Sequence, residues 1–252
     1  MPGVHGPDSS GHQTTADTLL GGRVKYRQPR DGLRASLDPV LLAAAIPARA
    51  GEMVLEGGTG AGAALLCVAS RVAGLSGVGI DRDENLLRLA RDNATANGFA
   101  ELHFIVADLA MAPIDGGFDH AFANPPYHAP DGTRSPFAAR DAAKRGEIGL
   151  LPRWVEALSR PLRHRGTLTF ILPPRLLPSA LAAMREHQIG PEVVFPIWPK
   201  PGHPARFVLL RGRKHGRAPL TLAAGLVLHT DTGAFRPEAE AILRGDAALR
   251  LN

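Results

Sequence analysis

The tetrapeptide Asn124-Pro125-Pro126-Tyr127 can do chemistry on a planar amino group. The lone pair of such a nitrogen is delocalised into the neighbouring π-system, which makes it a poor nucleophile. The Asn124 side-chain oxygen and the Pro125 carbonyl can each accept one N–H hydrogen bond, which draws the nitrogen toward a tetrahedral shape and frees its lone pair. Pro126 biases Pro125 toward an extended conformation, so this carbonyl is held out for an external donor. Tyr127 offers a ring face on which a flat substrate can stack.

A glycine-rich loop lies upstream of this motif. The segment Glu56-Gly57-Gly58-Thr59-Gly60-Ala61-Gly62 follows the short apolar stretch 53–55. Glycines here let the chain turn sharply from strand to helix and let a ligand approach the backbone, while the helix expected over 61–72 points its N-terminal amides at that ligand. The spacing differs from the dinucleotide pattern Gly-x-Gly-x-x-Gly, and an acid stands at the strand end. We therefore expect a nucleotide-type ligand beside Glu56, Gly58, Gly60 and Gly62.

Two further acids follow the next two expected strands. Asp81 ends the strand expected over 77–80, where a carboxylate can accept hydrogen bonds from ribose hydroxyls. Asp108 ends the strand expected over 102–107, where it can accept from an adenine exocyclic amine while the Leu109 backbone amide donates to the ring. Either Asp alone could instead be a helix N-cap or a turn residue. Three acids at three successive strand ends, with the tetrapeptide at the fourth, favour one shared site.

Strands and helices are expected to alternate along most of the chain, which is typical of a parallel sheet with sites at the carboxyl ends of its strands. After Gly190 the strands 193–198 and 207–210 are separated by too few residues for a helical crossover, so they should pair antiparallel. The fold class is therefore α/β, a doubly wound, mostly parallel sheet with a terminal antiparallel hairpin. The other expected strands are 53–56, 77–80, 102–107, 118–123 and 166–172, and the expected helices are 38–45, 61–72, 84–97, 149–162 and 176–187.

Taken in order, the glycine loop, the acids and the tetrapeptide resemble the class I S-adenosylmethionine-dependent methyltransferases that modify planar amines. This resemblance implies a Rossmann-like fold, S-adenosylmethionine as the cofactor, and residues 124–127 as the catalytic motif. It places Asp81 on the ribose of the cofactor. Asp108 and the Leu109 amide would hold its adenine, and Glu56 would lie near its methionine or ribose side.

The N-terminal part of the sequence narrows the resemblance. Residues 19–24 (Leu-Leu-Gly-Gly-Arg-Val), 28–29 (Gln-Pro) and 37–44 (Leu-Asp-Pro-Val-Leu-Leu-Ala-Ala) are similar to the signature of the bacterial tRNA1(Val) (adenine-N6)-methyltransferase family. The resemblance covers nearly the whole chain from about residue 17 and implies a tRNA substrate, with an adenine next to the anticodon of valine tRNA as the target. The chain departs from the family at Glu56, where many relatives have Asp, and in the Pro-rich residues 128–132.

The composition is that expected of a cytoplasmic enzyme. With 252 residues the chain is long enough for one α/β domain with a sizeable core. The single cysteine, Cys67, excludes an internal disulfide and a Cys-cluster metal site, and we expect no metal. No apolar run approaches the ~18 residues of a membrane span, and no signal-peptide pattern is present. We expect a disordered N-terminus (1–16) and one domain (17–252) made of an N-terminal extension (17–50), a catalytic core (51–215) and a C-terminal segment (216–252).

Basic residues occur in clusters. Their excess over acids is modest, 29 against 24, a net charge of +5. A basic run is often only a solvated face, but clusters of Lys and Arg can also bind RNA phosphates. In a chain expected to modify a nucleobase, they favour an RNA partner. The clusters are Arg23, Lys25, Arg27, Arg30 and Arg34; Arg160, Arg163 and Arg165; and Lys200, Arg206, Arg211, Arg213, Lys214 and Arg217.

Other functions stay open from the sequence alone. A glutamine-N5 methyltransferase acting on release factors shares the Asn-Pro-Pro-Tyr motif, since a glutamine amide is also planar. Those enzymes normally carry a sizeable N-terminal helical domain, whereas fewer than 55 residues precede the first expected core strand here. An rRNA guanine-N2 methyltransferase uses the same motif. The intact motif disfavours an inactive nucleic-acid-binding module, and the absence of the Gly-x-Gly-x-x-Gly pattern disfavours an NAD-dependent oxidoreductase.

The segment 128–146 directly follows the catalytic motif. It is long and contains no obvious helix or strand, and loops of this kind are usually functional or disordered. We expect it to cover the substrate base. His128 is a candidate general base, although an amine can lose its proton after methyl transfer without a strong base, and surface histidines are common.

Overall fold

The computed structural model describes residues 6–7, 13–30, 36–126 and 149–251. Its strands are β1 (Gly6–Pro7), β2 (Gln13–Leu19), β3 (Val24–Pro29), β4 (Met53–Gly57), β5 (Ser76–Asp81), β6 (Leu102–Val106), β7 (Phe118–Ala123), β8 (Leu162–Leu172), β9 (Ile189–Trp198), β10 (Phe207–Lys214), β11 (Thr221–Leu222) and β12 (Leu226–Val227). Its helices are η1 (Leu20–Gly22), α1 (Leu37–Ala45), α2 (Ala63–Arg71), α3 (Glu84–Ala96), η2 (Pro174–Leu176), α5 (Leu177–Glu186) and α6 (Pro237–Arg244), and residues 149–159 are also helical.

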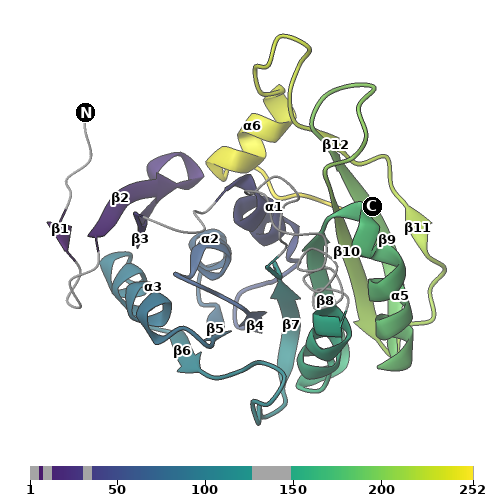
Figure 1. Cartoon of the computed structure of the whole chain (residues 1–252), viewed down its shortest axis with the longest axis horizontal. Coiled ribbons are helices and arrows are strands. Elements are labelled where there is room, and N and C mark those ends of the chain that lie inside the picture. Colours follow the sequence, from purple (N-terminus) through teal and green to yellow (C-terminus); the bar gives the residue numbers. More distant parts are fainter. Residues whose placement is uncertain (1–5, 8–12, 31–35, 127–148, 252) are drawn as a thin grey trace, which may run out of the picture.

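The central sheet has the strand order β11-β9-β10-β8-β7-β4-β5-β6, with β12 also paired to β9 (Figure 1). The five strands from β4 to β8 run parallel to one another. β10 is antiparallel to both of its neighbours, β8 and β9. The predicted α/β class, the mostly parallel sheet and the terminal antiparallel hairpin are therefore confirmed. β8 begins at Leu162 rather than at 166, so the preceding helix is shorter than predicted.

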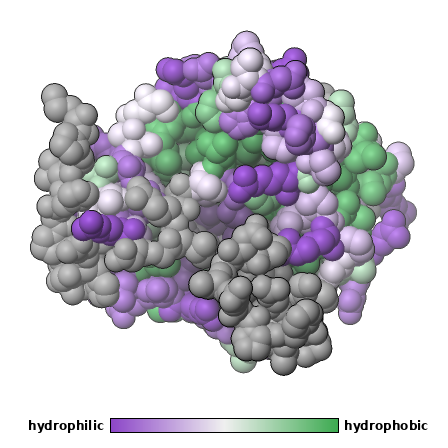
Figure 2. Space-filling model, turned by 45° about the horizontal axis from the view of Figure 1, so that its top comes forward, coloured by the Kyte–Doolittle hydropathy of each residue, from purple (hydrophilic) through white to green (hydrophobic). Residues whose placement is uncertain are grey.

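Helices cover both faces of the sheet. α1, α2 and α3 pack on one face, where Leu41, Leu65 and Leu87 are fully buried. The helix over 149–159 and α5 pack on the other face, with Leu158 and Met184 in the core. Because both faces of the sheet are covered, every residue of β7 is buried, rather than only alternate ones. On the outside of the molecule, hydrophilic residues lie among smaller hydrophobic areas on the face shown in Figure 2.

An N-terminal hairpin of β2 and β3, which the sequence analysis did not predict, lies beside α3 (Figure 1). Along β3 buried and exposed residues alternate, as in a strand with one face on the core. Gly21 and Gly22, with φ angles of 63° and 99°, supply the left-handed backbone of the turn. β2 begins at Gln13 and buries Thr14, so this strand crosses the boundary predicted between residues 16 and 17.

The C-terminal segment returns to the N-terminal part of the chain. β11 and β12 extend the sheet by pairing in parallel with β9. α6 then packs against α1 and η1, and the Leu249 amide donates to the Ala44 carbonyl at 2.9 Å. The segments predicted as 17–50 and 216–252 are thus in contact, and their division from the core 51–215 remains a proposal.

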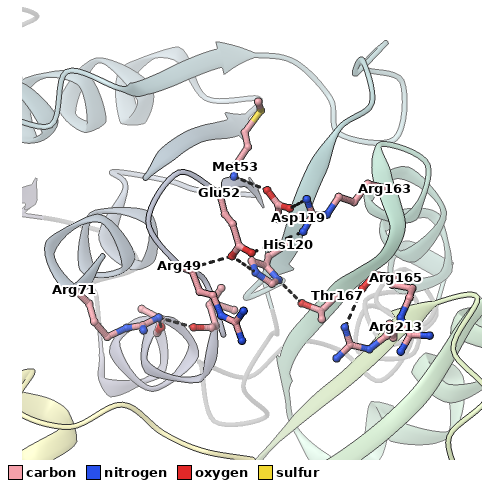
Figure 3. A network of polar contacts seen from close by, with 12 residues as sticks. Arg49, Glu52, Met53, Arg71, Asp119, His120, Arg163, Arg165, Thr167 and Arg213 are labelled. Carbon is pink, nitrogen blue, oxygen red and sulfur yellow. Dashed lines mark hydrogen bonds and ion pairs between the residues drawn. The ribbon is translucent and has the colours of Figure 1, made fainter. Parts of the chain in front are cut away.

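A polar network lies at the amino ends of β4, β7 and β8, called here the amino edge (Figure 3). His120 Nε2 lies 3.0 Å from Glu52 Oε2, and its Nδ1 lies 2.7 Å from Thr167 Oγ1. A neutral ring satisfies both contacts, because Nε2–H can donate to the carboxylate while Nδ1 accepts from the hydroxyl. Burial lowers the pKa of His120 despite the neighbouring Glu52 carboxylate. Asp119 ties the same strands together, since its Oδ2 accepts from the Met53 amide at 2.8 Å.

Acidification should weaken this network. The folded state holds His120 neutral, whereas the unfolded chain binds a proton near its ordinary pKa of 6.5. The stabilisation is therefore complete above that pH and is lost as the pH falls toward the lowered folded-state pKa. His120→Gln keeps a donor and an acceptor without titrating. Between about pH 7.5 and about pH 5.5, the free energy of unfolding of the wild type should fall relative to this variant, by at most about 1.4 kcal/mol per pH unit.

Urea unfolding followed by circular dichroism at several pH values measures this difference. His203→Gln, which changes an exposed histidine, is the matched control and should track the wild type. A wild-type and His120→Gln difference that stays constant with pH would contradict a neutral, buried His120.

Candidate active site

The register of the parallel strands brings the predicted residues to one edge of the sheet, the carboxyl ends of β4 to β8, called here the carboxyl edge. Gly57, the last residue of β4, lies opposite Ile80 of β5 and Ala123 of β7. The residues that follow in these three segments are Gly58, Asp81 and Asn124. From β4 the chain order runs outward in both directions, and such switch points are where α/β sheets bind ligands.

Three glycines with positive φ shape the loop between β4 and α2. Gly58, Gly60 and Gly62 have φ angles of 66°, 54° and 89°, in the left-handed region that side chains disfavour. A Cβ added to Gly58 would lie 2.5 Å from Trp154, so this glycine is needed for packing. A Cβ added to Gly60 would meet nothing within 4 Å, so this glycine faces open space from which a ligand can approach the backbone.

Asp81 holds this loop from the end of β5. Its Oδ2 accepts from the Gly60 amide at 2.8 Å, and its Oδ1 accepts from the Asp83 amide at 3.0 Å. Each carboxylate oxygen has a second lone pair, and the side chain is only partly buried, so the group can also accept from a ligand hydroxyl. The contact predicted between Asp81 and a ribose is compatible with this geometry and remains a proposal.

Glu56 lies beneath the loop. Its side chain is buried, and Oε2 accepts from the Thr59 hydroxyl at 2.6 Å and from the Leu65 amide of α2 at 3.1 Å. Burial raises the pKa of Glu56 to about 8, with Asp81 adding to the rise, although both hydrogen bonds oppose it. The carboxyl therefore braces the loop and the first turn of α2. Its predicted contact with the methionine or ribose side of the cofactor remains a proposal.

The side chains of Asp108 and Leu109, just after β6, differ in their burial. Asp108 is exposed, and its Oδ1 accepts from the Ala110 amide at 3.0 Å. Leu109 is buried, and its Cδ2 would lie 2.6 Å from a Cβ added to Gly57. The turn thus leaves the Asp108 carboxylate at the rim of the carboxyl edge, where the proposed contact with an adenine amine requires it.

The catalytic motif follows β7 directly. Asn124 is half-buried, and within the described part of the chain its side-chain amide has no hydrogen-bond partner. Pro125 is buried and Pro126 is exposed. Tyr127 and the segment 128–146, with His128, lie outside the described residues. Asn124 is thus a polar side chain with unused hydrogen-bonding capacity, next to the glycine loop.

Residues that the sequence analysis missed also reach this loop. Tyr26 of the hairpin is buried. Burial raises the pKa of its hydroxyl, and the nearby Glu56 carboxyl adds to the rise, which places this part of the hairpin near the base of the loop. Asn93 of α3 donates to the Ala61 carbonyl at 3.1 Å. A sequence signal for Asn93 did exist, because it is a polar residue on the buried face of α3 with Leu89 and Ala90.

A family model described as the methyltransferase small domain matches residues 36–144. This segment of the chain is similar to the methyltransferase small domain. The matched range includes the glycine loop, Asp81, Asp108 and residues 124–127. The class I S-adenosylmethionine-dependent methyltransferase architecture expected from the sequence is therefore confirmed.

Relatives with assigned activities act on different acceptors. A tRNA1(Val) (adenine(37)-N6)-methyltransferase from Actinobacillus succinogenes is 32% identical over 156 residues, which cover 60% of this chain and 65% of that protein. A release factor glutamine methyltransferase from Bradyrhizobium diazoefficiens is 43% identical over 70 residues, 28% of this chain and 24% of that protein. A tRNA (guanine(6)-N2)-methyltransferase from Thermus thermophilus is 40% identical over 106 residues, 40% of this chain and 32% of that protein. The similarity thus spans less than two thirds of each relative.

Solved structures agree with this assignment of the fold. A crystal structure of a predicted O-methyltransferase from Agrobacterium tumefaciens superposes with a TM-score of 0.72 at 26% identity, over 85% of this chain and 99% of that one. The structure of TrmN from Thermus thermophilus gives a TM-score of 0.54 at 26% identity, over 73% of this chain and 51% of that one.

S-adenosylmethionine is the cofactor of this fold, and the residues at the carboxyl edge fit it. The open face of Gly60 lies directly beside the Asp81 carboxylate, which suits a nucleoside that brings ribose hydroxyls close to the backbone. The described residues contain no group of three or more His, Cys, Asp or Glu side chains arranged to hold a metal ion. Nor does the described part of the chain include a helix with the length and apolar character needed to span a membrane.

The raised pKa of Glu56 makes stability depend on pH in the opposite sense to His120. The carboxyl stays protonated in the folded state up to about pH 8 but ionises in the unfolded state above its ordinary pKa of 4.5. Its stabilisation is thus complete below about pH 4.5 and is lost as the pH rises through about 8. Glu56→Gln retains an oxygen that can accept from Thr59 and Leu65. Raising the pH from about 5.5 to about 8.5 should therefore reduce the unfolding free energy of the wild type relative to this variant.

Urea unfolding at both pH values measures the change, for which one titrating group allows at most about 1.4 kcal/mol per pH unit. Glu84→Gln, an exposed glutamate in the first turn of α3, is the control and should show no such trend. Parallel pH profiles for the wild type and Glu56→Gln would mean that the buried carboxyl is ionised in the folded state.

Proposed function

We propose that the chain transfers a methyl group from S-adenosylmethionine to the exocyclic N6 amine of an adenine in tRNA. The observation that carries this proposal is Asn124, whose amide has no hydrogen-bond partner within the described part of the chain and follows β7 beside the glycine loop. The similarity to the Actinobacillus succinogenes protein supports valine tRNA, and the adenine beside its anticodon, as the target. Such an enzyme would act in the cytoplasm, where tRNA is used.

The cofactor would lie across the carboxyl edge. Gly58, Gly60 and Gly62 form the cradle, Asp81 accepts from the ribose, and Asp108 with the Leu109 amide holds the adenine. S-adenosylmethionine supplies an electrophilic methyl group on a positively charged sulfur. The bracing of the loop by Glu56 fixes the cradle before the cofactor arrives, so little ordering is left to occur on binding.

The catalytic motif would hold the acceptor amine in line with that methyl group. Asn124 Oδ1 and the Pro125 carbonyl each accept one N–H, Pro126 keeps this carbonyl exposed to the donor, and Tyr127 stacks on the flipped base. With the cofactor bound there, the nitrogen lone pair would form the new N–C bond as the C–S bond breaks, and the methylated amine would then release a proton to solvent. Catalysis is chiefly positioning together with these two acceptors.

The presence of two hydrogen-bond acceptors, Asn124 Oδ1 and the Pro125 carbonyl, also favours nitrogen rather than oxygen as the methylated atom. A hydroxyl has one O–H and can use only one of them, whereas an exocyclic amine uses both. This distinguishes the proposal from the O-methyl transfer named for the Agrobacterium tumefaciens protein.

The proposed RNA contacts lie near the same edge. β10 runs antiparallel to β8, so its start lies at the carboxyl edge and its end at the amino edge. Arg206, just before β10, is exposed and lies over the Phe207 ring at 5.4 Å, while Lys200 Nζ contacts only a backbone carbonyl, that of Asp231, among the described residues. Arg206 also attracts the Asp38 carboxylate, but neither cation forms an ion pair within 4 Å among the described residues, so both can still contact phosphates.

The basic residues at the amino edge are less available for RNA. Arg213 pairs with Glu192 at 2.6 Å, and Lys214 Nζ donates to the Ser159 carbonyl at 2.6 Å. Arg163 forms an ion pair with Asp119. The cluster that is continuous in sequence from Lys200 to Arg217 is therefore divided in space, and we assign the RNA contacts to its first half.

A second candidate function is glutamine-N5 methylation of a release factor. The local identity of 43% to the Bradyrhizobium diazoefficiens enzyme favours it, and the same two acceptors would suit a glutamine amide. Guanine-N2 methylation of RNA is a third candidate, supported by the Thermus thermophilus relative, because that amine is also exocyclic and planar.

Label transfer from S-adenosylmethionine distinguishes these acceptors. The chain would be incubated with labelled cofactor and, separately, unmodified total tRNA, rRNA or release factor, followed by nucleoside or peptide analysis. We expect the label in N6-methyladenosine from tRNA. Label in methylguanosine, or only in protein glutamine, would overturn the adenine assignment in favour of the corresponding alternative.

Asn124 variants test the mechanism in the same assay. Asn124→Ala should reduce the rate of methyl transfer by about 10²- to 10³-fold, the usual effect of losing one group that binds the reacting centre. The dissociation constant for S-adenosylmethionine, measured by calorimetry, should change by less than about threefold, and Asn124→Asp, which keeps an acceptor oxygen, should retain more activity. Equal losses of rate and cofactor affinity in Asn124→Ala would make Asn124 a structural residue.

A further inference from the structure

Two asparagines, Asn93 in α3 and Asn97 at its C-cap, hydrogen-bond to the backbone of the N-terminal hairpin. Asn97 Oδ1 accepts from the Lys25 amide at 2.8 Å, and its Nδ2 donates to the Lys25 carbonyl at 2.7 Å. One helical turn earlier, Asn93 Oδ1 accepts from the Arg27 amide at 2.8 Å, and its Nδ2 donates to the Arg27 carbonyl at 2.9 Å. Each side-chain amide therefore hydrogen-bonds to both the backbone N–H and the backbone C=O of one residue of β3.

The spacing of helix and strand explains why this pairing repeats. Four residues of α-helix rise about 6 Å, and two residues of a strand span about 6.6 Å. Lys25 and Arg27 lie two residues apart in β3, whose other edge pairs with β2. The two asparagines thus take the place of the peptide groups of a neighbouring strand and satisfy the edge of β3 that does not pair with β2.

Only one of the two asparagines also reaches the glycine loop. Asn93 Nδ2 donates to the Ala61 carbonyl at 3.1 Å, and this residue is 2% exposed. Asn97 Nδ2 makes its other contact with the Asn93 carbonyl, within α3. Asn93 is therefore shared by the hairpin, α3 and the loop, whereas Asn97 joins only the hairpin and α3.

The contact at Ala61 falls between two glycines of the cradle. On one side the Gly60 amide is held by Asp81, and on the other Gly62 caps α2. Asn93 fixes the carbonyl between them, which limits the freedom of a loop whose glycines otherwise allow many backbone conformations.

We infer that Asn93 is a positioning residue for the cofactor: it sets the glycine loop in its binding conformation and couples that conformation to the docked hairpin. The inference rests on the proposed function, in which this loop binds S-adenosylmethionine. Asn93 contacts the loop backbone and not the reacting atoms, so its loss affects cofactor affinity more than the chemical step.

Asn93 and Asn97 form a matched pair for testing this inference. Both Asn93→Ala and Asn97→Ala remove two hydrogen bonds to the hairpin, but only the first leaves the Ala61 carbonyl without its donor. Asn93→Asp is isosteric and still accepts from the Arg27 amide, yet it cannot donate to Ala61. Asn97→Asp is its control.

The dissociation constant for S-adenosylmethionine should rise about tenfold in both Asn93 variants, the effect of leaving one buried carbonyl unpaired. The two Asn97 variants should stay within about twofold of the wild type. At saturating cofactor the turnover number of the Asn93 variants should remain close to that of the wild type, so that the change appears in KM. Amide hydrogen exchange should quicken at residues 60–62 in the Asn93 variants only.

Equal losses of cofactor affinity in Asn93 and Asn97 variants, in proportion to their melting temperatures, would overturn the inference, because general loosening of the hairpin would explain them. Unchanged affinity in a folded Asn93→Asp variant would overturn it as well. A folded wild-type chain that binds no S-adenosylmethionine would be a different failure: it would contradict the proposed function, and the inference with it.

Discussion

The parallel pairing of β4 with β5 on one side and β7 on the other is the constraint on which the site depends. It sets Gly57 level with Ile80 and Ala123, so the three segments that follow leave the sheet together. A slip of one residue would turn every side chain of a strand to the opposite face, and β7 is buried along its whole length. At the amino edge, the Met53 amide bound to Asp119 ties β4 to β7 and favours the same alignment.

The two edges of the sheet use polar groups differently. At the amino edge His120, Glu52, Thr167 and Asp119 satisfy one another or the backbone, which stabilises the register. At the carboxyl edge some hydrogen-bonding groups have no partner among the described residues, as in the Asn124 amide, and Asp81 keeps lone pairs that can accept further hydrogen bonds. Unused hydrogen-bonding groups cost folding free energy unless a ligand or water satisfies them, so their presence beside a braced loop is typical of a binding site.

Much of this arrangement could be predicted from the sequence. The parallel strands were predictable because each contains a short run rich in apolar residues. In a parallel sheet, an acid at the end of a strand must lie at the carboxyl edge. The role of Glu56 was less readable. Its position next to glycine predicts a ligand contact, which remains a proposal, but gives no sign that the side chain lies under the loop and accepts from Thr59 and Leu65.

The rest depended on contacts between distant segments. The N-terminal hairpin could not be predicted because its docking depends on residues about 70 positions later, Asn93 and Asn97, which hydrogen-bond to the backbone of β3. The sequence does not show that the basic cluster from Lys200 to Arg217 is divided in space. β10 carries the two ends of this cluster to opposite edges of the sheet. The sequence also could not predict that Arg213 and Arg163 pair with half-buried and buried acids, Glu192 and Asp119.

We propose above all that the aligned strand ends place the methyl donor between the glycine loop and Asn124. A crystal structure with S-adenosylhomocysteine bound tests it most directly. We predict that the ribose hydroxyls lie within hydrogen-bonding distance of the Asp81 carboxylate and that the sulfur faces Asn124. A ligand bound away from the carboxyl edge, or oriented with its sulfur away from Asn124, would contradict this arrangement.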